Sequence, residues 1–263
     1  MRHSTLVLVL LAGFFFNGCT SLTDKPVQFN GLSDCEPAKV ILAQPKQLGP
    51  KSSTHTLQCA LTALRESSDP ALVRSALPAR LALHLAERST NQSEKEALAN
   101  EGVALAKRAL AQGAERDGAV HYYLAANLGL AIHEHPLQAA DNLASLEQEL
   151  KLAADLSPAV DDGGPLRLLG MLYLKAPPWP TGIGDGDKAL ELLKKAADAY
   201  PDHPLNHLFY GQALWEVDEN SLLADQSLTV GREKLNTGAW GYNKAIWNKE
   251  FNAVAKEVSA SSR

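Results

Sequence analysis

Two histidines, His203 and His207, stand four residues apart, a spacing that can place zinc ligands on one face of a helix. No third ligand follows at a spacing that would complete such a site, and His203 is expected at a helix cap. The sequence also contains no GxSxG motif, no phosphate-binding glycine loop and no carboxylate pair arranged for acid–base catalysis. It therefore predicts no metal site, no cofactor and no catalytic residue, and we do not expect an enzyme.

The first of three cysteines stands where a lipid could be attached. The apolar stretch Leu6–Phe16 is too short to span a bilayer, and Cys19 follows it directly after Gly18. This order is typical of a lipoprotein signal peptide, in which the cysteine thiol is acylated before cleavage. We therefore expect residues 1–18 to be removed and Cys19 to be lipidated, which would anchor the protein to a membrane. The alternative is an ordinary secretory signal with Cys19 as a bystander.

The other two cysteines, Cys35 and Cys59, would remain in the exported chain. Because an oxidising compartment favours disulfides, we predict a bridge between them. It would close a loop of about 24 residues and stabilise the fold by roughly 3 kcal/mol in the chain-entropy model. The alternative is two buried thiols.

The net charge and the remaining apolar segments limit the partners and the location that we expect for the chain. The net charge of −5 argues against nucleic acid as a partner. The most apolar later segment, Ala119–Ile132, contains His121 and Asn127, so we interpret it as a buried helix. Thr20, and not aspartate, follows Cys19, which favours sorting to the outer membrane over the inner one. The predicted location is periplasmic and lipid-anchored.

The most unusual segment covers residues 176–186 and is rich in proline and glycine. Three prolines stiffen it, which lowers the entropy cost of presenting Trp179, a side chain favoured at interfaces. The alternative is that Trp179 folds back over the helix ends. Asp185 is a further candidate binding residue, although either Asp185 or Asp187 would most simply serve as the N-cap of the next helix.

Arg167 stands in an otherwise apolar stretch shortly after Asp161 and Asp162. One interpretation is an ion pair within the protein. The other is a charge-assisted hydrogen bond to a small organic acid ligand.

The elements that must position these residues are helices. Alanine and leucine dominate, and no segment alternates with the period of a strand, so the predicted fold class is all-α. We expect a tether at residues 19–33 and a single helical-repeat domain at residues 34–263. Its candidate helices are Thr54–Glu66, Pro70–Arg88, Ser93–Gln112, Asp117–His133, Pro136–Leu156, Pro165–Lys175, Asp187–Tyr200, Pro204–Val217, Ser221–Asn236 and Tyr242–Ser259.

The helix expected at Pro204–Val217 is apolar around most of its circumference. Such a helix must be covered on several sides, as happens within a stack of helical hairpins. Three aromatic residues on the candidate helices, Tyr173, Tyr210 and Trp215, are further candidates for binding a ligand or partner.

The spacing within residues 160–218 resembles that of tetratricopeptide repeats. The matching residues are Gly170-x2-Tyr173, Ala189-x3-Leu193-x2-Ala196 followed by Pro201, and Tyr210-Gly211-x2-Leu214. The resemblance implies a stack of antiparallel helical hairpins, an α-solenoid.

A more specific resemblance covers the same stretch. The segments Asp161–Arg167, Leu169-Gly170-x2-Tyr173, Ala176-Pro177-Pro178, Gly182-x-Gly184-Asp185 and Lys188-Ala189 are similar to the T-component family associated with TRAP transporters. The resemblance implies a periplasmic lipoprotein that partners a TRAP substrate-binding protein, or another periplasmic protein, and that self-associates as a trimer. The alternative function is a general envelope scaffold that assembles protein complexes.

Overall fold

The computed structural model describes residues 26–260, so the predicted signal peptide, Cys19 and the first part of the tether lie outside the described residues. Within this range the chain forms twelve α-helices and no sheet, which confirms the all-α prediction. The helices are α1 (Ala38–Ile41), α2 (Thr54–Glu66), α3 (Pro70–Val73), α4 (Leu77–Arg88), α5 (Gln92–Ala111), α6 (Gly118–Ile132), α7 (Pro136–Leu156), α8 (Gly164–Lys175), α9 (Gly186–Ala199), α10 (Pro204–Glu216), α11 (Ser221–Thr237) and α12 (Asn243–Ala260), with a 3₁₀ turn at Pro45–Gln47.

Polar caps explain where several helices begin. The side chains of Ser53, Asn91 and Asp117 accept hydrogen bonds from backbone N–H groups in the first turns of α2, α5 and α6. Prolines open α7 and α10, where a missing N–H costs nothing. These local signals are why the bounds of α2 and α7 coincide with the predicted helices.

The single helix predicted at Pro70–Arg88 is wrong, because the chain breaks between α3 and α4. Pro78 is the second residue of α4 and has no N–H to donate to the carbonyl of Arg74. Its ring would also clash with that carbonyl in a continuous helix. The helix therefore ends at Val73 and restarts at Leu77.

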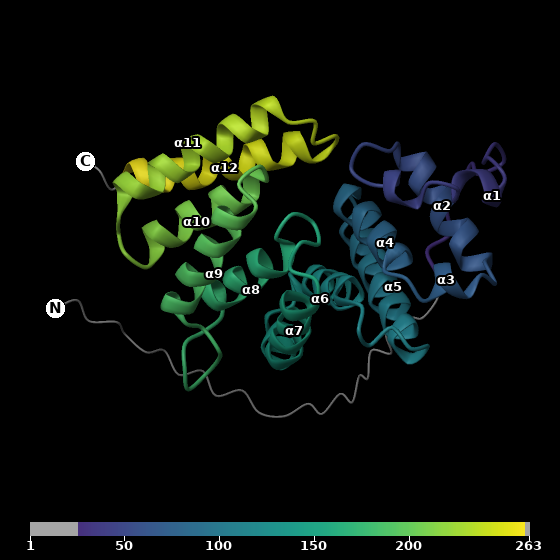
Figure 1. The fold of residues 1–263 in the computed structure, drawn as a ribbon, viewed down its shortest axis with the longest axis horizontal. Helices are drawn as coiled ribbons and strands as arrows, with labels where there is room; N and C mark the ends of the chain where they lie inside the picture. The colour runs from purple at the N-terminus through teal and green to yellow at the C-terminus, as the bar shows by residue number, and fades with distance from the viewer. Residues whose placement is uncertain (1–25, 261–263) are drawn as a thin grey trace, which may run out of the picture.

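Consecutive helices pack side by side as antiparallel pairs, from α4 to α12 (Figure 1). Three apolar cores run along this row of helices. The first lies around Leu61 and Leu81, the second around Val120, and the third around Leu208 and Phe251. Helix α10 buries residues on several sides, as its apolar surface requires, whereas the buried residues of α7 and α9 lie along one face.

The two ends of the row meet, as the approach of the α11–α12 turn to the loop before α2 shows in Figure 1. The backbone N–H of Tyr242 donates to the carbonyl of Pro50 at 3.3 Å. The Arg88 guanidinium lies 4.0 Å from the centroid of the Tyr242 ring, and the Tyr242 hydroxyl donates to Glu87. Gly241 has φ +58°, and a Cβ there would stand 2.1 Å from the Pro50 carbonyl, so this approach requires glycine.

The predicted disulfide is confirmed, since Cys35 and Cys59 are bonded with their Cα atoms 5.6 Å apart. It ties the segment before α1 to α2. None of the helices between residues 26 and 260 combines the length and apolarity needed to cross a bilayer.

Candidate functional site

Trp179 projects from a compact loop between α8 and α9, with 85% of its surface exposed. The loop is closed by the N–H of Gly184, which donates to the carbonyl of Pro177 at 2.8 Å, and by Thr181, whose hydroxyl donates to the carbonyl of Pro178. A Cβ at Gly184 would lie 2.1 Å from the carbonyl of Ala176, so only glycine permits this closure. The alternative that Trp179 folds back over the helix ends is wrong in this structure.

Asp185 caps α9, the structural role that the sequence allowed for it. Its carboxylate accepts from the N–H of Lys188 at 3.1 Å and pairs with the ammonium of the same residue at 2.9 Å. These bonds to Lys188 hold the pKa of the Asp185 carboxyl below its usual range. The backbone N–H of Asp185 donates to the carbonyl of Tyr173, which joins the end of the loop to α8.

The Tyr173 side chain is buried and engaged within the protein. Its hydroxyl donates to Glu147 at 2.5 Å, and Lys151 donates to the same carboxylate at 2.7 Å. Burial raises the pKa of Tyr173, so the hydroxyl keeps its proton and remains a donor. Tyr173 therefore joins α8 to α7 and does not face a free binding surface.

Tyr210 and Trp215 are half-buried against the third apolar core, between α10 and its neighbours. Both contribute packing to that core, and Tyr210 lies one turn of α10 after Asn206. Among the six candidate residues, the described part of the chain shows a hydrogen bond only between Tyr173 and Asp185.

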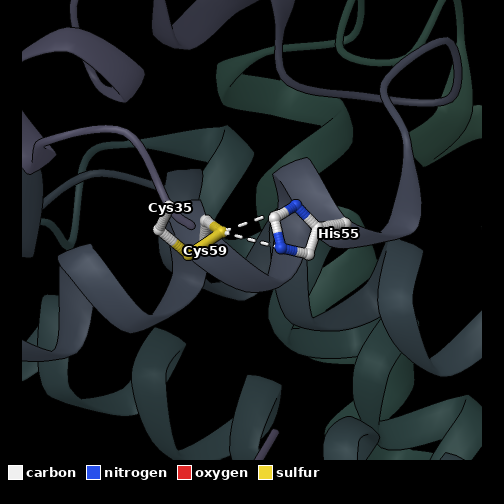
Figure 2. Close-up of side chains that lie close together, drawn as sticks. All are labelled: Cys35, His55 and Cys59. Atoms are coloured by element: carbon white, nitrogen blue, oxygen red, sulfur yellow. Dashed lines mark hydrogen bonds between the residues drawn. A yellow bond between two sulfur atoms is a disulfide. The ribbon is translucent and has the colours of Figure 1, made fainter. Parts of the chain in front are cut away.

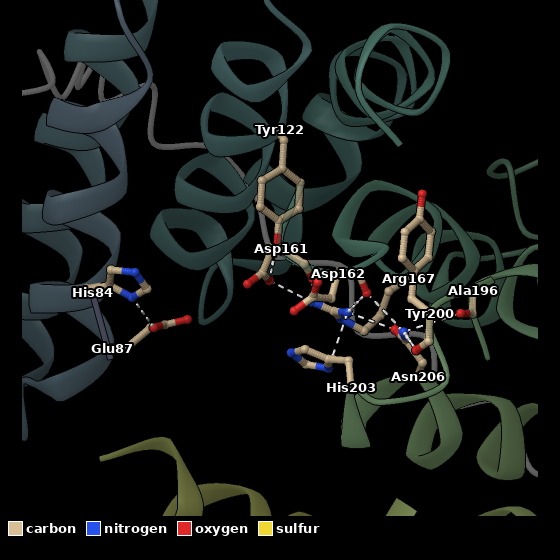
Figure 3. A network of polar contacts seen from close by, with 10 residues as sticks. All are labelled: His84, Glu87, Tyr122, Asp161, Asp162, Arg167, Ala196, Tyr200, His203 and Asn206. Atoms are coloured by element: carbon tan, nitrogen blue, oxygen red, sulfur yellow. Dashed lines mark hydrogen bonds and ion pairs between the residues drawn. The ribbon is translucent and has the colours of Figure 1, made fainter. Parts of the chain in front are cut away.

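Arg167 is 2% exposed and lies at the centre of a polar network (Figure 3). Its guanidinium donates to the Asp161 carboxylate at 2.6 Å and to Asn206 Oδ1 at 2.7 Å. It also donates to the carbonyls of Asp161 and Asp162, at 3.2 and 3.3 Å. The ion-pair interpretation of Arg167 thus describes the structure, in which these groups occupy its donors.

A left-handed turn before α8 explains how two successive carbonyls reach Arg167. Asp161, Asp162 and Gly163 have φ values of +51°, +48° and +86°. Aspartate tolerates this region better than most residues, and glycine adopts it freely. In this turn the carbonyls of Asp161 and Asp162 accept from Arg167 in α8. The Tyr122 hydroxyl of α6 also donates to the Asp161 carboxylate, at 2.8 Å.

Asn206, in the first turn of α10, and His203, the N-cap residue of that helix, complete the network. Asn206 is fully buried and donates to the carbonyls of Tyr200 at 2.8 Å and Asp162 at 3.0 Å. His203 Nδ1 lies 3.4 Å from an Arg167 nitrogen, where only a neutral imidazole can accept. Burial, with the Arg167 charge adding to it, lowers the pKa of His203 to about 3.

His203 also begins an aromatic cluster that the sequence did not reveal. Its ring centroid lies 5.3 Å from that of Trp240 and 5.2 Å from that of Trp247. The signal for this cluster is absent from the local sequence, because α12 folds back over α10 to bring Trp247 to His203. His207 takes a different direction and hydrogen-bonds the Pro201 carbonyl, so the two histidines share no ligand site.

Two hollows of about 870 and 670 Å³ lie between the helices of this row. Asp161, Asn243 and Trp247 line both of them. The larger is lined by Trp240 as well as Trp247, and by Lys46, Lys51 and Lys234. Lys234 pairs with Asp202 at 2.8 Å, whereas Lys46 and Lys51 form no ion pair within residues 26–260. Asp161, Asp162 and Asp202 also line this hollow, the first paired with Arg167 and the third with Lys234. The aromatic walls suit a molecule with an apolar part, and Lys46 and Lys51 can pair with an anionic group.

Tyr242 joins the two ends of the row of helices. Burial raises the pKa of its hydroxyl, so it remains a donor to Glu87. We expect Tyr242→Phe to lower the free energy of unfolding by about 1–2 kcal/mol, since it removes a hydrogen bond to a charged group. Tyr242→Ala should cost about 1 kcal/mol more, because it also removes the ring from Arg88.

Urea titration followed by circular dichroism measures both losses. The matched control is Tyr210→Phe, since the Tyr210 hydroxyl makes no hydrogen bond within the described residues. If Tyr242→Phe were as stable as this control, the bond to Glu87 would not hold the ends together.

No protein-family model matches the sequence, and no curated protein matches it. The likeness to the T-component family therefore rests on the quoted residues alone.

Proposed function

We propose that this chain is an exported, lipid-anchored helical-repeat protein that docks the substrate-binding protein of a TRAP-type transport system. The observation that carries the proposal is the exposed Trp179, held out by a closed loop within the stretch that resembles the T-component family. The antiparallel helix pairs support a tetratricopeptide-like solenoid. The bridge between Cys35 and Cys59 supports passage through an oxidising compartment.

Trp179 has the properties of a docking anchor. Tryptophan is enriched among the residues that dominate binding energy, and its apolar ring gains free energy when a partner removes it from water. The loop bonds fix the backbone before binding, so little entropy is lost when the partner docks. The lipid at Cys19 would keep this loop near a membrane, where a transporter's periplasmic partner works.

A small organic acid, which the sequence suggested as a ligand of Arg167, is also part of the proposal. The larger hollow supports this part. We assign no ligand contact to Arg167, because both of its Nη atoms already donate within the protein. Lys46 and Lys51 can pair with a carboxylate at the rim, while the apolar part of the acid lies against Trp240. The self-association as a trimer implied by the family is part of the same proposal, and sedimentation equilibrium measures it.

We expect Trp179→Ala to weaken binding to the substrate-binding protein by about 10- to 100-fold, as loss of an interface tryptophan does. Isothermal titration calorimetry against the substrate-binding protein of the same organism measures the change. The matched control is Leu137→Ala, which removes a side chain that is 84% exposed on α7.

A wild-type chain that bound no substrate-binding protein would contradict the proposal. Equal affinities for Trp179→Ala and wild type would instead contradict the role of the loop. Capture of envelope-assembly proteins only would favour the general scaffold.

A further inference from the structure

The disulfide has a histidine beside it (Figure 2), and a carboxylate binds that histidine. His55 precedes Cys59 by one turn of α2, and its Nδ1 and Nε2 atoms lie 3.8 and 3.7 Å from Cys59 Sγ. The Cys35, His55 and Cys59 ligand atoms all lie within 4.8 Å of one another. Asp34 Oδ1 hydrogen-bonds His55 Nε2 at 3.0 Å.

We propose that Cys35, His55 and Cys59 bind a thiophilic divalent cation of the zinc type once the disulfide is reduced. A tetrahedral zinc has Zn–S distances of about 2.3 Å and Zn–N distances of about 2.0–2.1 Å, which places neighbouring ligand atoms roughly 3.5–3.8 Å apart. The separation of His55 Nδ1 from Cys59 Sγ, 3.8 Å, already meets this requirement. The two sulfurs must move apart, which breaking their bond permits, and Cys35 Sγ, within 4.8 Å of the His55 ligand nitrogen, must also reach its ligand distance.

Asp34 is the positioning residue of this site. A histidine that binds zinc usually donates its other ring N–H to a carboxylate, which fixes the tautomer and the ring orientation. The bond between Asp34 and His55 Nε2 leaves Nδ1 as the nitrogen that faces the metal. Three protein ligands leave the fourth position open to water, and the Asp34 and His55 side chains, 76% and 44% exposed, give access to it.

The site depends on reduction, since a disulfide has no thiolate to offer. A dithiol reductant attacks the more exposed sulfur, that of Cys35, and the Cys59 thiolate leaves beside His55. A second thiolate of the reductant then releases Cys35, so two electrons and two protons pass to the protein as the reductant becomes a disulfide. Zinc next displaces the two thiol protons into solvent.

Contacts other than the disulfide hold Cys35 near α2 after reduction. The backbone N–H of Val27 donates to Glu101 at 3.3 Å, and the Arg65 guanidinium lies 4.9 Å from the centroid of the Phe29 ring. Arg65 and Glu101 are themselves paired at 2.7 Å between α2 and α5. The segment before Cys35 therefore stays attached to the helices, and the ligands remain close.

The test uses the full chain carrying Cys19→Ser, so that the third thiol contributes nothing. Reduced protein titrated with Co²⁺ should show one equivalent of tetrahedral cobalt with thiolate charge-transfer bands, and Zn²⁺ should displace it. His55→Ala and Cys35→Ser/Cys59→Ser should lose these bands. Asp34→Ala should weaken Zn²⁺ binding by about 10- to 100-fold. The control His133→Ala, in a side chain that is 75% exposed on another helix end, should change nothing.

Circular dichroism of the reduced chain and of Cys35→Ser/Cys59→Ser shows whether the helices persist without the bridge. Reduced protein that binds Co²⁺ no better than the double serine variant would overturn the proposal, whether or not it stays folded. Binding that survives His55→Ala would also overturn it, since two thiolates would then suffice. None of these outcomes depends on docking a transport protein.

Discussion

Replacing Arg167 with methionine should lower the free energy of unfolding by about 3 kcal/mol, the cost of removing one partner from a buried ion pair. Arg167 is 2% exposed, and the methionine would leave Asn206 Oδ1 and the Asp161 carbonyl without their donor, whereas the Asp162 carbonyl keeps the Asn206 amide. The Asp161 side chain is 42% exposed, so water offsets part of the loss there. This exposure places the expected cost at the lower end of the range for buried pairs.

The matched control for Arg167→Met is Lys194→Met, which breaks an exposed ion pair of 2.6 Å with Asp198 within α9. A pair of this kind contributes about 0.3–0.5 kcal/mol. Urea unfolding at neutral pH compares the two variants. If Arg167→Met were as stable as Lys194→Met but lost binding of an organic acid, Arg167 would serve the ligand and not the fold.

The local signals in the sequence explain why most helix bounds could be predicted. Caps such as Ser53 and opening prolines such as Pro136 act within one turn, so their effect can be read from neighbouring residues. Pro78 carried the same kind of information against a helix running from Pro70 to Arg88. The predicted helix is wrong because a proline at this position has no N–H for the helical hydrogen bond and is tolerated only in a first turn.

The contacts of the candidate residues could be predicted only where both partners lie in one segment of the sequence. Asp185 or Asp187 was expected to cap α9, because the cap and its helix are adjacent in sequence, and Asp185 does so. The Arg167 network instead joins residues from Tyr122 to Asn206, and Tyr242 meets Glu87 across 155 residues. Nothing in the local pattern indicates which distant side chain satisfies a buried charge, because the stacking of the helices decides it.

For Trp179 the sequence predicted the loop but not the direction of the side chain. The prolines and glycines around it predicted a stiff loop, and the hydrogen bonds of Thr181 and Gly184 agree with that expectation. Whether the ring faced the protein or the solvent depended on space over the helix ends. That space is set by side chains of other helices, so both alternatives remained open until the fold was known.

The second large effect is that of pH: we expect His203 to lower the free energy of unfolding as the pH falls. Unfolded, His203 takes up a proton as the pH falls through about 6.5. Folded, its pKa is lowered to about 3 by burial and by the Arg167 charge, so the native state stays neutral there. Between these values the unfolded state binds more protons, and stability falls by about 1.4 kcal/mol for each unit that the pH drops. Above pH 6.5 His203 contributes no slope.

His203→Phe keeps a ring against Trp240 and Trp247 but removes the titration. We therefore expect this variant to lose stability more slowly than wild type between pH 6.5 and pH 4, with a slope smaller by up to about 1.4 kcal/mol per pH unit. Urea unfolding at half-unit steps of pH measures both slopes. His133→Phe, at a side chain that is 75% exposed, controls for removing a histidine as such. Equal slopes for wild type and His203→Phe would mean that the folded protein admits a proton at His203, and the bond from Arg167 would then have to break to accommodate it.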